Sequence, residues 1–316
     1  MLMQNTSSPT PAAAGYPDGL PGLVDAVQHK NPMHRKFMAG ALAQMTVDET
    51  QRLEQYIAYC QQRGLTIDYL SDCYLTIVGD TLREQIYFQK HRQYRYSTFA
   101  EVGASVYFND EYMSFYMYGL ALTAFLWPNH LAMLRFFRDN LPKNSGGKYL
   151  EVGPGHGYYL MTAMEYAGYD SFTGIDISET SIAQTRALIQ HFGGGRHAER
   201  FDLQCMDFLA CTLPADSFDA VVMGEVLEHV EQPQLFLKQA ARIARKDAYI
   251  YITSCLNAPA VDHIFLFRDT AQLEKLFDDC GLRIRQQLVC PYQGTTLQES
   301  MESLLAVNVA YVLEKK

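Results

Sequence analysis

Three closely spaced glycines give the sequence its first sign of chemistry. Gly153, Gly155 and Gly157 follow an apolar run in the stretch LEVGPGHG. Glycines at the end of a strand let the backbone turn sharply and approach a ligand, and the following helix directs its N-terminus into the same crevice. The dinucleotide fingerprint G-x-G-x-x-G would need a glycine where Tyr158 stands, which counts against a nicotinamide-dependent dehydrogenase.

Acidic residues end the next two strands that the sequence predicts. Asp176 closes the stretch TGID, where a carboxylate can accept hydrogen bonds from both hydroxyls of a ribose. Asp207 and Phe208 follow the third strand, where an acid and an aromatic ring can receive an adenine. An acid at a strand end is more often only a helix cap. The glycine loop and the two acidic strand ends nevertheless occur in order, one strand–helix unit apart. Together these three features indicate a nucleoside site.

The fourth predicted strand runs into a second chemically suggestive stretch, Gly224-Glu-Val-Leu-Glu-His229. If a helical turn begins here, Glu225, Glu228 and His229 can converge on one side. Two carboxylates and an imidazole suit a divalent ion such as Mg²⁺, Mn²⁺ or Zn²⁺. The competing interpretation is that the run only caps a helix beside a bound nucleoside.

The second half of the chain alternates short apolar runs with helical patterns, which predicts a parallel α/β sheet with right-handed crossovers. The expected strands are 148–152, 171–175, 201–204, 218–223 and 248–253. The expected helices are 156–167, 179–191, 232–244 and 270–280. Two further runs, 282–290 and 304–313, have no long helix between them and read as a terminal antiparallel pair.

The sequence pattern of the first half predicts helices. If the glycine loop is the binding site, these helices are expected to form the substrate-binding surface beside it. Apolar spacing predicts helices over 49–63 and from 67 to 87, and Thr46 with Glu49 forms a capping box. A turn-rich linker at 140–147 separates the two halves. We therefore expect a flexible tail at 1–22, a helical substrate-binding cap at 23–145 and a catalytic domain at 146–316.

The amino-acid composition indicates the cellular compartment and disfavours some classes of binding partner. The 26 basic and 35 acidic residues give a net charge of −9, which disfavours nucleic-acid binding. Seven scattered cysteines and the absence of a signal-peptide pattern predict a cytoplasmic protein with reduced thiols. The run 112–134 carries no charge but contains tyrosines, Pro128 and His130, so we expect a buried helix with a break at Pro128 and no membrane span.

Seven of the 21 tyrosines fall between Tyr87 and Tyr118. Most of these rings should pack in a core, but Tyr112 and Tyr116 share one helical face and are candidate substrate contacts. The only basic cluster, 90–95, reads as a solvated helix end, or else as a contact for a substrate anion or an acidic carrier protein.

The second half resembles the class I S-adenosylmethionine-dependent methyltransferases. The resemblance covers about residues 146–316 and rests on LEVGPGHG, GIDIS, MDF and SFDAVVMGEVLEHVEQP. It implies a Rossmann-like seven-stranded sheet with a reversed last strand and S-adenosylmethionine as cofactor. It places the cofactor against Glu151, the three glycines, Asp176, Ile177, Asp207, Phe208 and Glu225. The family's usual Lys-Pro-Gly-Gly turn is replaced by Arg245-Lys-Asp-Ala248, away from the cofactor.

A second segment of the sequence contains a further candidate metal ligand. His263, with Asp262 before it, lies past the fifth strand and can face the same crevice. The two segments together resemble the small-RNA 2′-O-methyltransferases, and the first alone resembles the ubiquinone-pathway O-methyltransferases. Carried over, the resemblance makes Glu225, Glu228, His229 and His263 the ligands of a divalent ion, Mg²⁺, Mn²⁺, Zn²⁺ or iron. The alternative is a metal-free general base, His263, oriented by Asp262 or Glu228.

The resemblance favours O-methylation of a small organic molecule, in specialised-metabolite biosynthesis, with His263, His229 and Glu228 catalytic. Methyl transfer needs in-line positioning and a deprotonated acceptor, which a metal or a histidine base supplies. Three alternatives stay open: a carbon or nitrogen acceptor, an RNA 2′-hydroxyl, and a non-catalytic cofactor-binding protein. Tyr112, Tyr116 and Asp262 are the candidate substrate contacts. We expect a small-molecule partner, no nucleic acid and no membrane, and a homo-oligomer or carrier protein as possible assemblies.

Overall fold

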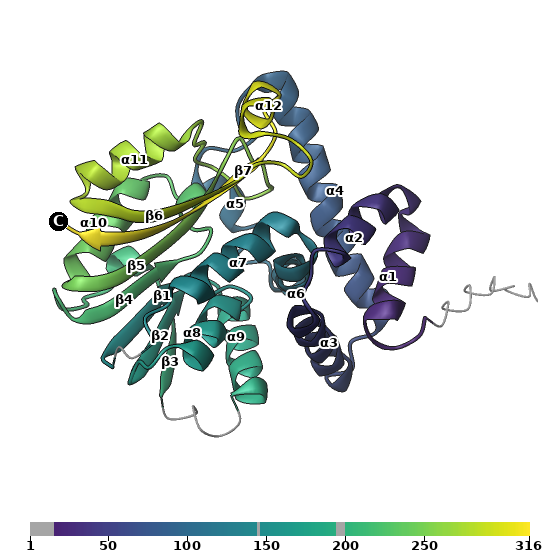
Figure 1. The fold of residues 1–316 in the computed structure, drawn as a ribbon, viewed down its shortest axis with the longest axis horizontal. Coiled ribbons are helices and arrows are strands. Elements are labelled where there is room, and N and C mark those ends of the chain that lie inside the picture. Colours follow the sequence, from purple (N-terminus) through teal and green to yellow (C-terminus); the bar gives the residue numbers. More distant parts are fainter. Residues whose placement is uncertain (1–15, 144–145, 194–199) are drawn as a thin grey trace, which may run out of the picture.

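The computed structural model describes residues 16–143, 146–193 and 200–316, and it contains a helical part and a sheet part (Figure 1). The helical part comes first in the chain. Its helices are α1 (Gly19–Lys30), α2 (Arg35–Leu42), α3 (Val47–Gln62), α4 (Ile67–His91), α5 (Phe99–Gly103), α6 (Asp110–Leu126) and α7 (Pro128–Asn140), with a short 3-10 turn at Pro32–His34.

The sheet part alternates strands and helices, as the sequence predicts. Its strands are β1 (Lys148–Val152), β2 (Ser171–Asp176), β3 (Phe201–Cys205), β4 (Phe218–Met223), β5 (Ala244–Leu256), β6 (Leu282–Cys290) and β7 (Val307–Lys315). Its helices are α8 (Tyr158–Tyr166), α9 (Glu179–Phe192), α10 (Pro233–Ile243), α11 (Thr270–Asp279) and α12 (Leu297–Glu302), with 3-10 turns at Phe208–Ala210 and Leu227–His229.

The seven strands form one sheet with the order β3-β2-β1-β4-β5-β7-β6. Strands β1 to β5 pair in parallel, whereas β7 runs antiparallel to both β5 and β6. This confirms the fold class, including the reversed last strand. The order reverses between β1 and β4, and open α/β sheets bind ligands at such a switch point, beyond the carboxyl ends of the strands.

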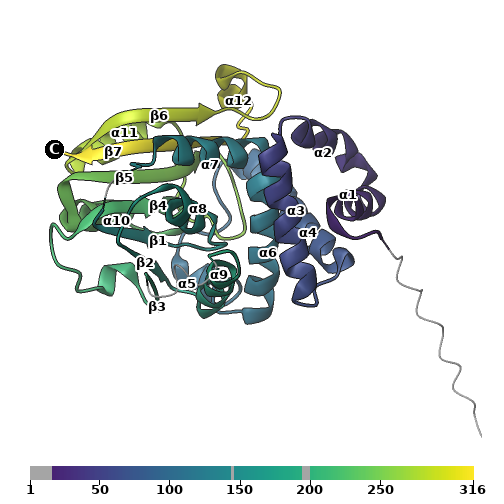
Figure 2. The same ribbon diagram turned by 60° about the horizontal axis from the view of Figure 1, so that its bottom comes forward.

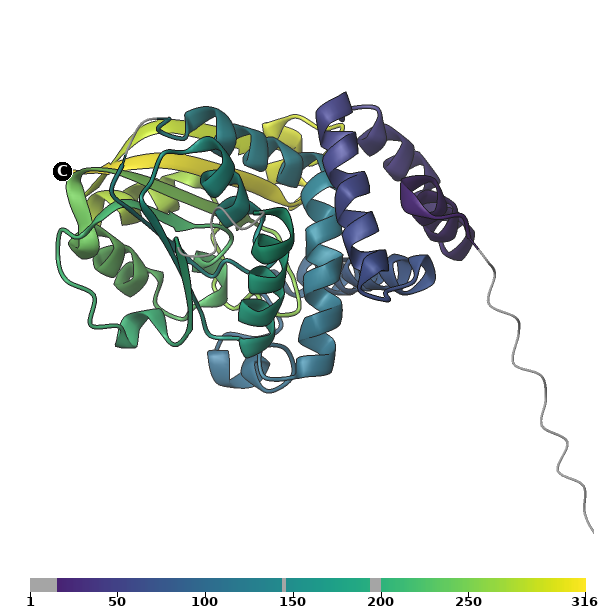
Figure 3. The same cartoon turned by 90° about the horizontal axis from the view of Figure 1, so that it is seen from below.

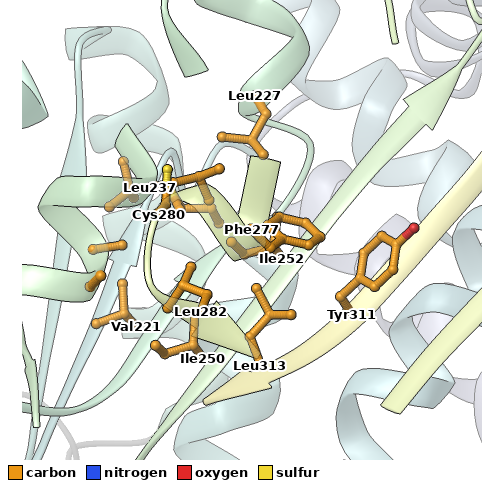
Figure 4. Close-up of a cluster of buried hydrophobic side chains, with 14 of the residues drawn as sticks. Val221, Leu227, Leu237, Ile250, Ile252, Phe277, Cys280, Leu282, Tyr311 and Leu313 are labelled. Atoms are coloured by element: carbon orange, nitrogen blue, oxygen red, sulfur yellow. The ribbon is translucent and has the colours of Figure 1, made fainter. Parts of the chain in front are cut away.

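Helices cover both faces of the sheet. On one face α10 and α11 pack against β4, β5 and β7 through Leu237, Phe277, Val221 and Ile250, all at most 1% exposed (Figure 4). On the other face Phe137 of α7 and Tyr159 of α8 pack against Tyr251 of β5. A sheet buried on both faces requires the near-continuous apolar strands that the sequence shows.

The helical part, apart from α7 on the face of the sheet, gathers at one end of the sheet, opposite the C-terminus (Figure 3). Its own core joins α1, α3, α4 and α6 through buried residues such as Leu23, Leu53, Tyr74 and Leu122. The predicted capping box at the start of α3 is present, with the Glu49 amide donating to the Thr46 hydroxyl at 3.3 Å. The prediction of a tail over 1–22 is wrong for residues 19–22, because α1 begins at Gly19 and buries Leu20; residues 1–15 lie outside the described part.

Helix α6 lies between helices α1 to α4 and the sheet part (Figure 2). It ends at Leu126 and α7 begins at Pro128, which confirms the predicted buried helix and its break. Within the described residues, no helix is long and apolar enough to cross a membrane. The division of the chain at residue 146 stays a prediction, since α7 packs on the sheet and the Tyr251 hydroxyl donates to the Met133 carbonyl at 2.8 Å.

Candidate active site

A cavity of about 530 Å³ lies at the carboxyl ends of the strands, between the sheet and the helical part. Its walls come from the loops after β1, β2, β3, β4 and β5 and from α4, α6 and α7. The helical part therefore forms one wall of the crevice at the strand ends. Apolar side chains dominate the helical wall, among them Met113, Met117, Leu120, Trp127 and Met133.

The glycine loop has the backbone conformation that its three glycines allow. Gly153, Gly155 and Gly157 all have positive φ, of 66°, 51° and 82°. Gly153 and Gly155 line the cavity. Gly157 serves packing instead, because a Cβ there would stand 3.1 Å from Leu188 and 3.2 Å from Thr185 on α9. The loop thus exposes backbone to a ligand at its first two glycines and seats α9 at the third.

Asp176 lies at the end of β2, where the sequence predicts a ribose contact. Its carboxylate accepts hydrogen bonds from the backbone N–H groups of Ser178 at 2.9 Å and Gly155 at 3.3 Å, and it lines the cavity. Burial raises its pKa to about 6 despite these donors. Ile177, the next residue, also lines the cavity.

The loop after β3 forms the far end of the same wall. Asp207 and Phe208 both line the cavity, beside Leu209 and Phe236. Asp207 also caps the short turn that follows, accepting a bond from the Leu209 N–H at 2.9 Å. The Phe208 ring packs on Phe236 with 5.6 Å between ring centres. A flat apolar slot with a carboxylate at its edge suits an adenine.

Glu151 departs from its predicted place. It is 1% exposed, does not line the cavity within the described residues, and accepts a hydrogen bond from the Tyr149 hydroxyl at 2.5 Å. Burial raises its pKa to about 8. Its side chain is therefore engaged by Tyr149 of the same strand and by the Leu160 backbone of α8, away from the cavity lining.

The four predicted metal ligands do not form one cluster. Glu228 is fully buried behind the cavity wall, and its carboxylate accepts a bond from the Ser254 hydroxyl at 2.9 Å. Glu225 lines the cavity beside Asn308, whose amide N lies 3.5 Å from its carboxylate. The groups of potential ligands within the described chain are Glu228, Cys255 and His263, and His229, Asp262 and His263. Neither contains Glu225, so the set implied by the resemblance is not assembled.

His229 is bound to Asp262, a residue on the loop after β5. The His229 Nδ1 lies 3.3 Å from the Asp262 carboxylate and 2.9 Å from the Tyr107 hydroxyl. Tyr107 and Tyr116 donate to the two oxygens of that carboxylate at 3.0 and 3.2 Å. Burial acts to lower the pKa of His229, but the charge of Asp262 outweighs it and raises the pKa to about 9. His229 is therefore protonated at neutral pH.

The pKa of His263 is shifted in the opposite direction to that of His229. Its Nδ1 donates to the Ala258 carbonyl at 2.6 Å, so its Nε2 is the unprotonated ring nitrogen. Burial and the charge of His229 lower its pKa and keep the ring neutral. The two rings meet edge to face, 4.7 Å apart, and both line the cavity. The prediction that Asp262 or Glu228 orients His263 is wrong, because a backbone carbonyl does so.

The comparisons with known proteins agree with this geometry. A family model described as a methyltransferase domain matches residues 129–304, more than half of the chain. The chain belongs to this methyltransferase domain family. Its resemblance to class I S-adenosylmethionine-dependent methyltransferases is thereby confirmed.

Curated relatives of this methyltransferase domain protein match only in part. The phosphatidylethanolamine N-methyltransferase of Cereibacter sphaeroides is 31% identical over 34% of this chain and 51% of its own length. The ubiquinone biosynthesis O-methyltransferase of Idiomarina loihiensis is 33% identical over 38% of this chain and 47% of its own length. The chain thus spans about half the length of these two relatives.

Solved structures share the methyltransferase fold at low identity. Mitomycin 7-O-methyltransferase superposes with a TM-score of 0.54 at 11% identity, over 79% of this chain and 70% of that one. Geranyl diphosphate C-methyltransferase of Streptomyces coelicolor gives 0.50 at 13% identity, over 65% and 84%.

The structure also corrects and extends the predicted substrate contacts of this methyltransferase. Tyr116 and Asp262 line the cavity, whereas Tyr112 does not line it within the described residues and donates to Asp80 on α4 at 2.7 Å. Sequence reasoning missed Tyr107 and His130 as cavity residues. Tyr107 was one ring among many in an aromatic stretch, but His130 stood out as a histidine in a run without charge.

Proposed function

We propose that the protein transfers a methyl group from S-adenosylmethionine to a hydroxyl of a small organic molecule, with His263 as general base. The observation that carries the proposal is the pair of histidines that line the cavity, His229 bound to the Asp262 carboxylate and His263 to the Ala258 carbonyl, so that the pKa of the first is raised and that of the second is lowered. Environments that push two pKa values apart assign an acid and a base.

The cofactor has its place on the strand ends. Asp176 accepts hydrogen bonds from the ribose hydroxyls, Asp207 and Phe208 hold the adenine, and Gly153 and Gly155 face the methionine part. Glu225 lies where the loops after β1 and β4 meet, since a Cβ on Gly153 would stand 3.0 Å from Val226. S-Adenosylmethionine then supplies a methyl group on a positively charged sulfur.

The histidines prepare the acceptor. His263 offers the lone pair of Nε2 to the acceptor hydroxyl and takes its proton as the methyl group arrives. The protonated His229, fixed by Asp262, stabilises the negative charge that develops on the acceptor oxygen. Tyr107 and Tyr116 hold Asp262 in place from the helical part, so a closed cap and an oriented imidazole depend on each other.

A divalent metal would supply the same activation by lowering the pKa of a bound hydroxyl. The geometry favours the histidine base, because Glu225 belongs to neither group of potential ligands in the described residues and His229 is paired with Asp262. Metal dependence stays a prediction that chelation can test. Specialised-metabolite biosynthesis and a cytoplasmic location also stay predictions.

The test uses S-adenosylmethionine and a panel of phenols, with the matching anilines beside them. We expect methyl ethers as products, and a loss of kcat of about 10² to 10⁴ in His263→Gln. EDTA treatment should leave the wild-type rate unchanged. Loss of activity in EDTA that Mg²⁺ restores would contradict the histidine base, and methylation of the anilines alone would contradict O-methylation.

A further inference from the structure

Two further histidines, His130 and His156, line the same cavity and have no part in the proposed chemistry. His130 belongs to the first turn of α7, just after the break at Pro128. Its ring lies beside Trp127, with 4.9 Å between ring centres. Apolar side chains of α6 and α7, Leu120, Met133 and Leu134, share this part of the wall.

Two hydrogen bonds determine which nitrogen of His130 carries its proton. The Thr123 hydroxyl donates to the Leu120 carbonyl at 2.8 Å. The same hydroxyl oxygen lies 3.1 Å from the His130 Nδ1. Both bonds can exist together only if Nδ1 carries the hydrogen and donates it to Thr123, because a hydroxyl has a single hydrogen to give. The Nε2 of His130 is then an acceptor.

Nothing in the described part of the chain pairs with that acceptor. The structure shows no hydrogen-bond donor to the His130 Nε2 among the described residues. Burial lowers the pKa of His130 to about 3, with smaller contributions from His156 and His263, so the ring is neutral. The cavity therefore contains a fixed, uncharged acceptor on a largely apolar wall.

We propose that His130 is a specificity-determining residue that accepts a hydrogen bond from a second donor group of the methyl acceptor. The substrate class that this defines is a small apolar molecule with two hydrogen-bond donors, typified by a dihydroxylated ring of which one hydroxyl is methylated. The proposal rests on the proposed function. Because a buried acceptor left unpaired is costly, the site rejects an analogue that lacks the second donor.

Binding can be measured without catalysis, because Trp127 is the only tryptophan in the chain and touches His130. With S-adenosylhomocysteine present, Trp127 fluorescence is titrated with phenol and with each of the three dihydroxybenzenes. We expect the best dihydroxybenzene to bind at least 10-fold more tightly than phenol. In His130→Phe the two should bind within about 2-fold of each other. His191→Phe, at an exposed position on α9, is the matched control and should keep the wild-type ratio.

A measurement without ligand tests whether the His130 Nε2 is a hydrogen-bond acceptor. Long-range nitrogen-15 NMR should show His130 with the hydrogen on Nδ1, and Thr123→Val should convert it to a mixture of tautomers. A wild-type His130 with the hydrogen on Nε2, or equal binding of phenol and all dihydroxybenzenes, would overturn the proposal. His263→Gln separates the two proposals, since it should lower kcat by about 10² to 10⁴ and keep the binding ratio. An unchanged rate in that variant would contradict only the base.

Discussion

At the residue scale, Asp176 offers a direct test of cofactor binding. Its ionised carboxylate is the form that accepts two ribose hydrogens, and its pKa is raised to about 6 by burial. We expect Asp176→Ala to weaken binding of S-adenosylhomocysteine at least 10-fold, about 1.4 kcal/mol or more, measured by calorimetry. In the wild type, binding should weaken as the pH falls from 7.5 to 5, because the carboxylate gains a proton.

The control for this prediction is Asp202→Ala, on β3 and exposed, which should bind normally. Equal affinity in Asp176→Ala and the wild type would remove the ribose contact from the proposal.

A second residue-scale prediction separates backbone strain from crowding in the glycine loop. Gly157 and Gly281 have similar φ, 82° and 76°, but only Gly157 would bring a Cβ against side chains, Leu188 and Thr185. Gly281→Ala should cost about 1–2 kcal/mol, the usual cost of that backbone region for other residues. Gly157→Ala should cost more, about 2–4 kcal/mol, in urea unfolding without ligand. Equal losses of unfolding free energy in the two variants would show that α9 can shift to accommodate the added Cβ at no cost.

At the scale of the elements, one half-buried ion pair ties α3 to α7. Arg135 donates to both carboxylate oxygens of Glu49 at 2.6 Å, and Glu49 is 4% exposed. Arg135 first, and the Thr46 cap with it, lower the pKa of Glu49 to about 2. Since α7 packs on the sheet and α3 belongs to the helical core, this pair ties that core to the helix that lies on the sheet.

The pair makes stability depend on pH in a defined direction. The folded pKa lies below the usual value of 4.5, so the stabilisation is complete above pH 4.5 and is lost as the pH falls toward 2. Glu49→Gln should lower the free energy of unfolding by about 1–3 kcal/mol at pH 7, and the difference from wild type should shrink between pH 4.5 and 2. Asp25→Asn, exposed on α1, should show neither effect. A difference that stays constant with pH would exclude the ion pair as its cause.

At the scale of the whole molecule, the cavity couples the two parts. A Cβ on Gly155 would stand 3.8 Å from the Met117 sulfur of α6, so cofactor and cap share one wall. We expect S-adenosylhomocysteine to slow hydrogen exchange in α6 and in Tyr107's loop as well as in the glycine loop. The backbone of α1, remote from the cavity lining, should exchange unchanged. Slowing confined to the sheet would contradict a cap that closes on the cofactor.

The sequence by itself determined the sheet, the glycine loop, the acids at the strand ends and the Thr46 capping box. These features follow from local periodicity and from backbone conformations that few residues adopt, so a short stretch is enough to specify them. β1, β4 and β6 have the predicted bounds for this reason.

Only the tertiary structure decided the roles of the side chains around the reaction. Asp262 binds His229 and not His263, Tyr107 reaches Asp262 across 155 positions of sequence, and Glu225 belongs to neither group of potential metal ligands in the described residues. Even the nitrogen that His130 presents depends on the neighbours that α6 brings to it. A hydrogen bond between side chains requires atoms within about 3 Å, and sequence patterns place elements without fixing the packing that brings such atoms together.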